Sequence, residues 1–246
     1  MSLNILLIGD SCIDTYTTGK VDRFSPEAPV PVFQPLYTSV KPGMASNVAN
    51  NFTALGCDVT LLTNKDKGIK TRYIDKKSGY QLLRVDEDIK IQSWDNKLPN
   101  TAEYDAVVIS DYNKGFLSYE QIERILNDST PLVFLDTKKK NLSRFNKAIV
   151  KVNESEYKSS TTICSNLIVT YGGSHVTFHD EKYTVPKVPV FDVCGAGDTF
   201  LAALVYDCCT NNYSIKEAIS FAIKASAVTV QHLGVYSPSL KEVKNG

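Results

Sequence analysis

Continuous apolar runs that end in a small or polar residue recur along the chain. Five of them lie at Asn4–Asp10, Asp105–Asp111, Pro131–Asp136, Ala148–Asn153 and Asn166–Gly172. Runs of Val, Ile and Leu without alternation predict parallel strands that are covered on both faces. Between the runs, residues with helical spacing lie at Ala45–Leu55, Ser118–Leu126 and Ser214–Leu233. Strand and helix in alternation predict an α/β fold with a mostly parallel central sheet flanked by helices.

Two segments break this rhythm. Thr15–Pro35 is extended and rich in proline, and Lys70–Asp88 alternates like a hairpin with Ser78-Gly79 at its turn. Neither suits a buried parallel strand, so we expect a small β lid, with segments at about 15–35 and 70–88, beside the main sheet. Exposed sheet edges are commonly paired or covered. The lid therefore predicts a homodimer formed through its strands.

Composition narrows the class of protein. The 246 residues fit one domain, 1–246, and 43% hydrophobic against 22% charged residues predicts a packed core. A formal net charge of zero argues against a general nucleic-acid binder. No apolar run approaches the ~20 residues of a membrane span, and the N-terminus lacks the basic region of a signal peptide. Six cysteines without a CxxC pair are typical of free thiols in a reducing compartment, so we expect a cytoplasmic protein.

Polar or small residues follow the predicted strands. They are Asp10, Asp14, Asp111, Asp136, Asn153 and Gly172. Ligands of open α/β sheets bind beyond the carboxyl ends of the strands. We therefore expect the functional site at this rim, although some of these residues also suit the caps of the following helices.

The stretch Gly195-Ala196-Gly197-Asp198 stands directly before an apolar helical run. A helix that begins there presents unpaired amides and the positive end of its dipole, and glycine lets the backbone approach an anion closely. A carboxylate in this turn makes chemical sense if it takes a proton from an attacking hydroxyl while the amides hold a transferring phosphoryl group. Asp198 also suits a helix N-terminus on electrostatic grounds alone, so this stretch by itself leaves both interpretations open.

Four motifs resemble the PfkB/ribokinase family of carbohydrate kinases, and they occur in that family's order. Val190–Leu204 (VFDVCGAGDTFLAAL) resembles the C-terminal signature, and Lys41–Gly56 (KPGMASNVANNFTALG) resembles the glycine loop and its helix. Asn153–Glu156 (NESE) resembles the N-x-x-E motif, and Val169–Gly173 (VTYGG) resembles the strand and turn beside the nucleotide. Together these motifs extend over nearly the whole chain.

Three further segments are similar to one branch of the family. They are RFSPEAPVPVF (Arg23–Phe33), LLRVDED (Leu82–Asp88) and ISDYNKGFL (Ile109–Leu117). That branch phosphorylates D-glycero-β-D-manno-heptose 7-phosphate at its anomeric hydroxyl. The resemblance therefore implies a ribokinase-like fold and an ATP- and magnesium-dependent conversion of this sugar phosphate to the 1,7-bisphosphate.

The resemblance also implies roles for individual residues. Asp198 is the implied general base, and the implied anion hole is formed by the amides of Gly195, Ala196 and Gly197. The residues implied to bind sugar hydroxyls are Asp14, Gly43 and Asn47, and the candidates for the sugar's own phosphate are Arg84 and Lys114. The residues implied at ATP are Lys138, Thr170 and Gly172, and those implied at magnesium are Asn153 and Glu156.

The chain departs from the family pattern in places. Met44 replaces the second glycine of a glycine pair, Ile223 stands where relatives often carry an asparagine near adenine, and His175 replaces a common glycine. Short segments at 63–70 and 153–170 predict a shortened fold. These departures leave other sugar substrates and a non-catalytic sugar-phosphate-binding or scaffold protein as alternatives. An NAD-dependent oxidoreductase is disfavoured, because the first strand lacks a G-x-G-x-x-G turn.

Overall fold

An eight-stranded sheet forms the centre of the computed structural model, which describes residues 2–245. Its order is β12-β11-β10-β9-β8-β7-β1-β4. The strands are β1 (Asn4–Gly9), β4 (Asp58–Thr63), β7 (Ala106–Asp111), β8 (Val133–Thr137), β9 (Ile149–Asn153), β10 (Leu167–Thr170), β11 (His175–Phe178) and β12 (Glu181–Thr184). All neighbours pair in parallel except the antiparallel β10–β11 and β11–β12 pairs at one edge. The mostly parallel sheet predicted from the apolar runs is confirmed.

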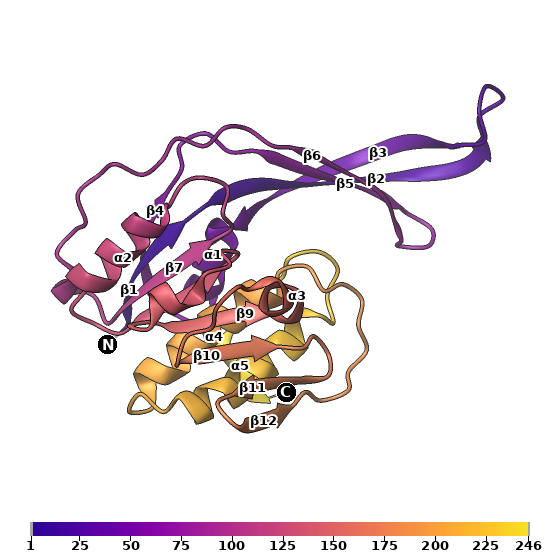
Figure 1. Ribbon diagram of the computed structural model, residues 1–246. Helices are drawn as coiled ribbons and strands as arrows, with labels where there is room; N and C mark the ends of the chain where they lie inside the picture. The colour runs from indigo at the N-terminus through magenta and orange to yellow at the C-terminus, as the bar shows by residue number, and fades with distance from the viewer. Residues whose placement is uncertain (1, 246) are drawn as a thin grey trace.

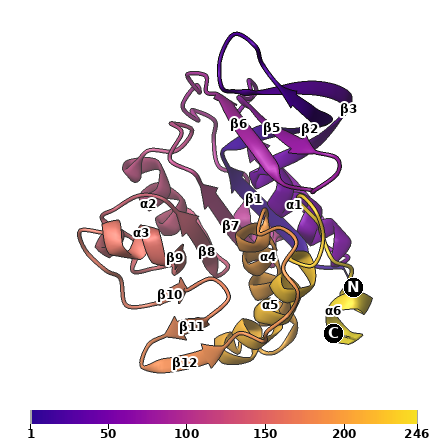
Figure 2. The ribbon, with the colours of Figure 1, turned by 90° about the vertical axis from the view of Figure 1, so that its right-hand side faces the viewer.

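Helices cover both faces of this sheet (Figure 2). One face packs against α1 (Ala45–Ala54), α4 (Ala196–Thr210), α5 (Ile215–Thr229) and α6 (Leu240–Asn245). The other face packs against α2 (Tyr119–Asp128) and the short 3-10 turn η2 (Leu142–Phe145). The remaining short elements are η1 (Thr101–Glu103) and α3 (Glu154–Ser159). Successive strand residues alternate between the two apolar cores, which is why their sequence reads as uninterrupted Val, Ile and Leu.

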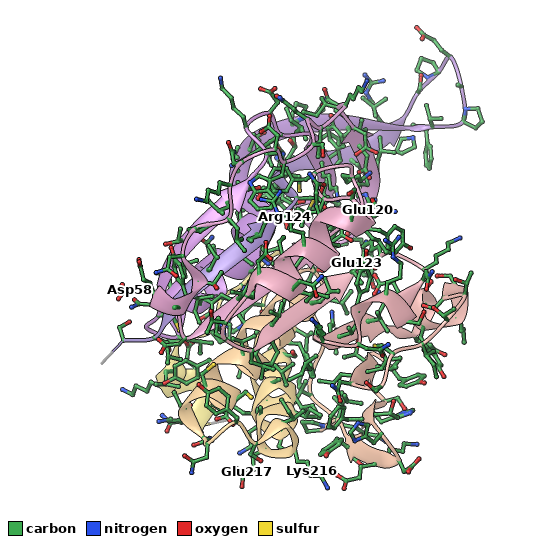
Figure 3. The ribbon with its side chains drawn as sticks, turned by 60° about the vertical axis from the view of Figure 1, so that its left-hand side comes forward. Asp58, Glu120, Glu123, Arg124, Lys216 and Glu217 are labelled. Atoms are coloured by element: carbon green, nitrogen blue, oxygen red, sulfur yellow. The ribbon has the colours of Figure 1, made fainter. Side chains whose placement is uncertain are left out.

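Helix α2 illustrates how the local sequence determines where a helix starts and which face is buried. Ser118 and Gln121 form a reciprocal capping box at its start, which satisfies amides that have no partner within the helix. Its apolar side chains Ile122, Ile125 and Leu126 are buried against the sheet. Its charged residues Glu120, Glu123 and Arg124 lie on the opposite face (Figure 3). A 3.6-residue period with a cap at its start therefore accounts for this helix.

A second sheet of four strands forms a lid that projects from the body of the molecule (Figure 1). Its order is β3-β2-β5-β6, with β2 at Ser11–Phe24, β3 at Pro31–Met44, β5 at Ile69–Asp75 and β6 at Gln81–Glu87. The predicted hairpin turn at Ser78-Gly79 is present, and Gly79 adopts a positive φ of 74° there. The first lid segment, predicted as extended chain at about 15–35, is a hairpin over 11–44, because β2 starts one residue after β1 and β3 continues to the start of α1. Asp14 therefore lies within a lid strand and not at the carboxyl end of a strand of the main sheet.

The connections are short where the sequence predicts a reduced fold. Between β4 and β5 the described chain has only the five residues 64–68, without a helix, and α3 has six residues. The six cysteines are all free thiols. No helix within residues 2–245 has the length and apolar character needed to cross a membrane.

Candidate functional site

The Gly195-Ala196-Gly197 turn forms the start of helix α4. Gly195 has a left-handed backbone with a φ of 79°, and a Cβ atom there would lie 2.9 Å from the side-chain nitrogen of Asn47. The amides of Gly195 and Gly197 have no hydrogen-bond acceptor among residues 2–245, so they are available to an anion. The amide of Ala196 instead donates to the carbonyl of Val193 at 3.3 Å. The predicted three-amide anion hole is therefore reduced to two free amides in this structure.

Asp198 lies in the first turn of α4 and is 6% exposed. Its Oδ2 accepts a hydrogen bond of 2.7 Å from the amide Nδ2 of Asn47, and its Oδ1 accepts one of 2.8 Å from the hydroxyl of Tyr112. Burial raises the pKa of Asp198 to about 6, although both hydrogen bonds oppose this shift. A carboxylate with this pKa is ionised at neutral pH and can accept a proton.

A cavity of about 130 Å³ lies in front of this turn, at the carboxyl ends of the strands. Its lining residues are Asp111, Tyr112, Asp136, Lys138, Lys151, Asn153, Glu156, Gly195, Gly197 and Asp198. Six residues to which the resemblance assigns a role therefore meet here: Lys138, Asn153, Glu156, Gly195, Gly197 and Asp198. Of the residues predicted at ATP, Thr170 and Gly172 are not part of the lining. The hydroxyl of Thr170 donates to the carbonyl of Val152 at 3.4 Å, and Gly172 lies in the turn after β10 with a φ of 55°.

Lys151 is a site residue that the sequence reasoning missed. It lies within β9, is buried, and its Nζ donates to Asp136 at 2.7 Å. The same Nζ would lie 3.1 Å from a Cβ atom added to Gly197, which places the ammonium group at the free amides. Lysine is almost never fully buried without a partner. The lysine inside the apolar run Ala148–Asn153 could therefore have indicated a buried charged site from the sequence alone.

Asn153 and Glu156 form the capping box of α3. The Asn153 amide donates to Glu156 Oε2 at 2.8 Å, and the Glu156 amide donates to Asn153 Oδ1 at 2.9 Å. Burial and the charge of Asp136 raise the pKa of Glu156. Among residues 2–245 no group of three or more His, Cys, Asp or Glu side chains is placed to hold a metal. The site fits magnesium, which takes oxygen ligands and keeps waters and phosphate oxygens around one or two carboxylates.

The inner face of the lid brings charged side chains towards the cavity. Asp14 forms a buried ion pair with Arg72, a residue that the sequence reasoning also missed. Gly43 is required beside this pair, because a Cβ atom there would lie 2.2 Å from Asp14 Oδ2. Arg84, directly opposite Arg72 in the β5–β6 ladder, is held by Asp86 through two hydrogen bonds of 2.7 and 2.8 Å.

A second, much smaller cavity of about 10 Å³ lies at the base of the lid. Its lining includes Met44, Cys12, Lys70 and Lys114, and Lys114 forms an ion pair of 2.7 Å with Asp88. Met44 is buried and adopts a φ of 58° and a ψ of −132°, a backbone conformation that suits glycine. The chain therefore keeps the backbone of a glycine loop while it carries a long side chain there.

The structure also shows what surrounds two other residues that depart from the family pattern, Ile223 and His175. Ile223 is buried in the apolar core together with helix α4. The ring of His175 stacks on the ring of Tyr171, with 4.3 Å between their centroids. Neither of the two lines the large cavity.

A protein-family model described as pfkB family carbohydrate kinase matches residues 63–242. Among curated proteins, the "Bifunctional protein HldE" of a Nitratiruptor species is 33% identical over 99% of this chain and 65% of its own length. The protein of the same name from Campylobacter fetus subsp. fetus is 30% identical over 99% of this chain and 66% of its own length. The chain thus spans about two thirds of the length of these curated relatives.

Solved structures of low sequence identity share the fold. Ribokinase from Thermotoga maritima matches with a TM-score of 0.68 and 18% identity, over 99% of this chain and 98% of its own. Arabidopsis thaliana ribokinase complexed with ribose and ATP matches with a TM-score of 0.72 and 15% identity, over 100% of this chain and 98% of its own. The ribokinase-like fold predicted from the sequence is therefore confirmed.

Proposed function

Because this chain belongs to the pfkB family of carbohydrate kinases, we propose that it transfers the γ-phosphoryl group of ATP to a hydroxyl group of a sugar phosphate. One observation carries the proposal: a buried carboxylate with a raised pKa, Asp198, lies in the same turn as two free backbone amides. The carboxylate suits proton removal, and the amides suit a transferring phosphoryl group.

In the proposed reaction Asp198 takes the proton of the acceptor hydroxyl. The hydroxyl oxygen forms a bond to the γ-phosphorus of ATP while the bond from that phosphorus to the bridging oxygen breaks, and ADP leaves. The amides of Gly195 and Gly197 and the ammonium group of Lys151 stabilise the negative charge on the transferring group. We assign Lys138, which lines the same cavity, to the phosphates of ATP.

Magnesium supplies the neutralising charge that phosphoryl transfer requires when it is bound with ATP. Glu156 and Asn153 are the residues that we propose to hold it, in part through water. Their capping box fixes both side chains at the cavity, and one carboxylate oxygen of Glu156 remains without a partner in the described chain.

The acceptor side of the site lies under the lid. Its inner face carries the guanidinium groups of Arg72 and Arg84 and the ammonium group of Lys70, against the carboxylates of Asp14 and Asp86. This excess of cations supports a sugar that carries its own phosphate. Together with the resemblance of the lid segments to one kinase branch, it supports D-glycero-β-D-manno-heptose 7-phosphate as the substrate and the 1,7-bisphosphate as the product.

The proposed specificity is tested by ADP release with a panel of sugars. Purified protein, ATP and magnesium are combined with heptose 7-phosphate, fructose 6-phosphate, and the same sugars without phosphate. We expect turnover only with phosphorylated sugars, and a raised KM for them in Arg84→Gln. Equal turnover of both classes would show that the lid cations do not recognise the sugar's phosphate. No ADP release with any sugar would favour a binding or scaffold protein.

The outer face of the lid supports a homodimer. Val40, Thr15, Thr71 and Val85 form one continuous row across all four strands, and Leu83 adjoins it on β6. Val40 is 65% exposed, Leu83 56% and Val85 39%. An aliphatic and threonine-rich sheet face of this kind suits the same face of a second copy. The free thiols and the use of ATP fit a cytoplasmic location.

A further inference from the structure

Tyr112 contacts the proposed base and lies near two lysines, one on the nucleotide side of the site and one on the lid. Its hydroxyl donates to Asp198 Oδ1 at 2.8 Å. Its ring centroid lies 4.6 Å from the ammonium nitrogen of Lys138, which follows strand β8, and 5.8 Å from that of Lys70 on the lid. The tyrosine therefore stands between the nucleotide side and the sugar side of the site.

The two oxygens of the Asp198 carboxylate have different surroundings. Oδ2 is held by Asn47, which does not line the large cavity, whereas Tyr112 and Asp198 both line it. Oδ1 is thus the oxygen whose hydrogen-bond partner, the phenol of Tyr112, lines the cavity. An acceptor hydroxyl must donate a hydrogen bond to the base before it loses its proton, and the phenol makes a hydrogen bond of this kind.

The backbone at Tyr112 is held by hydrogen bonds, so displacement of the phenol from Asp198 would require rotation of the side chain alone. Its amide donates to the buried carboxylate of Asp10 at 2.8 Å, and the next amide, that of Asn113, donates to Asp111 at 3.0 Å. Burial and the charge of Asp198 raise the pKa of Tyr112 well above its ordinary value. The phenol therefore remains a neutral donor throughout the working pH range.

We propose that in the free protein the hydroxyl of Tyr112 occupies the position of the acceptor hydroxyl on Asp198, and that the sugar must displace it before transfer begins. The inference rests on the proposed kinase function. While the phenol is in place, a water molecule cannot take the same position on the base. ATP bound without sugar is thereby protected from hydrolysis.

The test compares Tyr112→Phe with wild type and with Tyr183→Phe. The control removes another phenol-to-carboxylate hydrogen bond, that of Tyr183 with Glu181 at 2.6 Å on the edge strand β12. The other groups that face Asp198 stay in place in both variants; they are Asn47 on α1, Cys12 on β2, Asp136 on β8 and Lys151 on β9. Any change in the titration of Asp198 is then due to the lost hydroxyl.

The pH dependence of kcat/KM reports the free enzyme, whereas that of kcat reports the complex with substrates. A hydrogen bond to a charged group stabilises it enough to change its pKa by about one unit. In Tyr112→Phe we expect the acid limb of kcat/KM to move up by about one unit and the acid limb of kcat to stay in place. The sugar should bind about tenfold more tightly, because no hydrogen bond has to be broken. ATP hydrolysis without sugar should rise, and Tyr183→Phe should behave as wild type in every assay.

Two results would overturn the proposal. If both acid limbs move together and kcat falls, Tyr112 stays on the base during transfer. If neither limb moves, the phenol does not occupy the base in solution. The carboxyl-carbon NMR titration of Asp198 in the free protein, assigned with Asp198→Asn, needs no substrate. It decides about Tyr112 even if wild type phosphorylates no sugar: a higher Asp198 pKa in Tyr112→Phe supports the contact, and an unchanged one refutes it.

Discussion

The side-chain amide of Asn47 donates a hydrogen bond of 2.7 Å to the carboxylate of Asp198, 151 positions later in the chain. Asn47 belongs to the glycine loop and its helix, and Asp198 belongs to the start of α4. The contact therefore joins the two motifs that resemble the family's signatures. It also means that Asn47, predicted as a sugar ligand, is engaged with the proposed base in the free protein.

Activity should depend on pH through Asp198. Burial raises the pKa of this carboxyl to about 6, and a general base must be ionised to accept a proton. We therefore expect kcat/KM for the sugar to fall as the pH drops through about 6 and to be level from there to pH 8. Rate measurements from pH 5 to 9 check this, with protein folding followed by circular dichroism. An acid limb near 4 would mean that burial does not raise this pKa.

Replacing Lys151 by methionine should reduce turnover. The substitution removes a charge at the proposed phosphoryl site, and losing one such stabilising group typically costs about 10²- to 10³-fold in kcat. Lys139→Met is the matched control, because Lys139 is also buried and bonds to Asn113 at 2.9 Å and Asp111 at 3.4 Å without lining the cavity. Both variants lose a buried ion pair, so both should be less stable by about 3 kcal/mol. Steady-state kinetics and urea unfolding separate the two effects, and equal losses of kcat would argue against a role for Lys151.

Met44 should tolerate glycine better than alanine. Both substitutions remove the long side chain from the second cavity, but only glycine relieves the positive φ of 58°. A residue held in such a region stores about 1–3 kcal/mol. We therefore expect Met44→Gly to be more stable than Met44→Ala by about 1 kcal/mol, whereas glycine usually costs about 0.5–1 kcal/mol relative to alanine. Urea unfolding of the two variants measures the difference, and a more stable alanine variant would show that the position is unstrained.

The proposed dimer should dissociate when charge is placed on the outer face of the lid. The double substitution Val40→Lys and Val85→Lys puts two ammonium groups in the row that the second copy would cover. We expect sedimentation velocity to show a dimer for wild type and a monomer for this variant. Ile163→Lys, at a residue that is 61% exposed and outside the lid, should remain dimeric. A monomeric wild type at micromolar concentration would contradict the proposal.

Local pattern predicted the main elements because each parallel strand is buried on both faces and each helix has one apolar face. The start of α4 was also predictable, since Gly195 and Asp198 suit a helix N-terminus that binds an anion. The parallel pairing of β2 with β5 was not, because it joins distant segments; the side chains of Asp14 and Arg72, which it brings together, are 58 positions apart. For the same reason the sequence could not place Asn47 and Tyr112 on Asp198, or the ammonium of Lys151 beside Gly197.

Phosphorus NMR of the protein with ATP, magnesium and D-glycero-β-D-manno-heptose 7-phosphate measures the proposed transfer itself. We expect a new anomeric phosphate signal for wild type. In Asp198→Asn the rate should fall by about 10²- to 10⁴-fold, the usual contribution of a positioned acid or base, with an unchanged melting temperature showing that the variant is folded. Transfer by Asp198→Asn at the wild-type rate would contradict the account, and so would the absence of transfer from folded wild type to this or any other sugar phosphate.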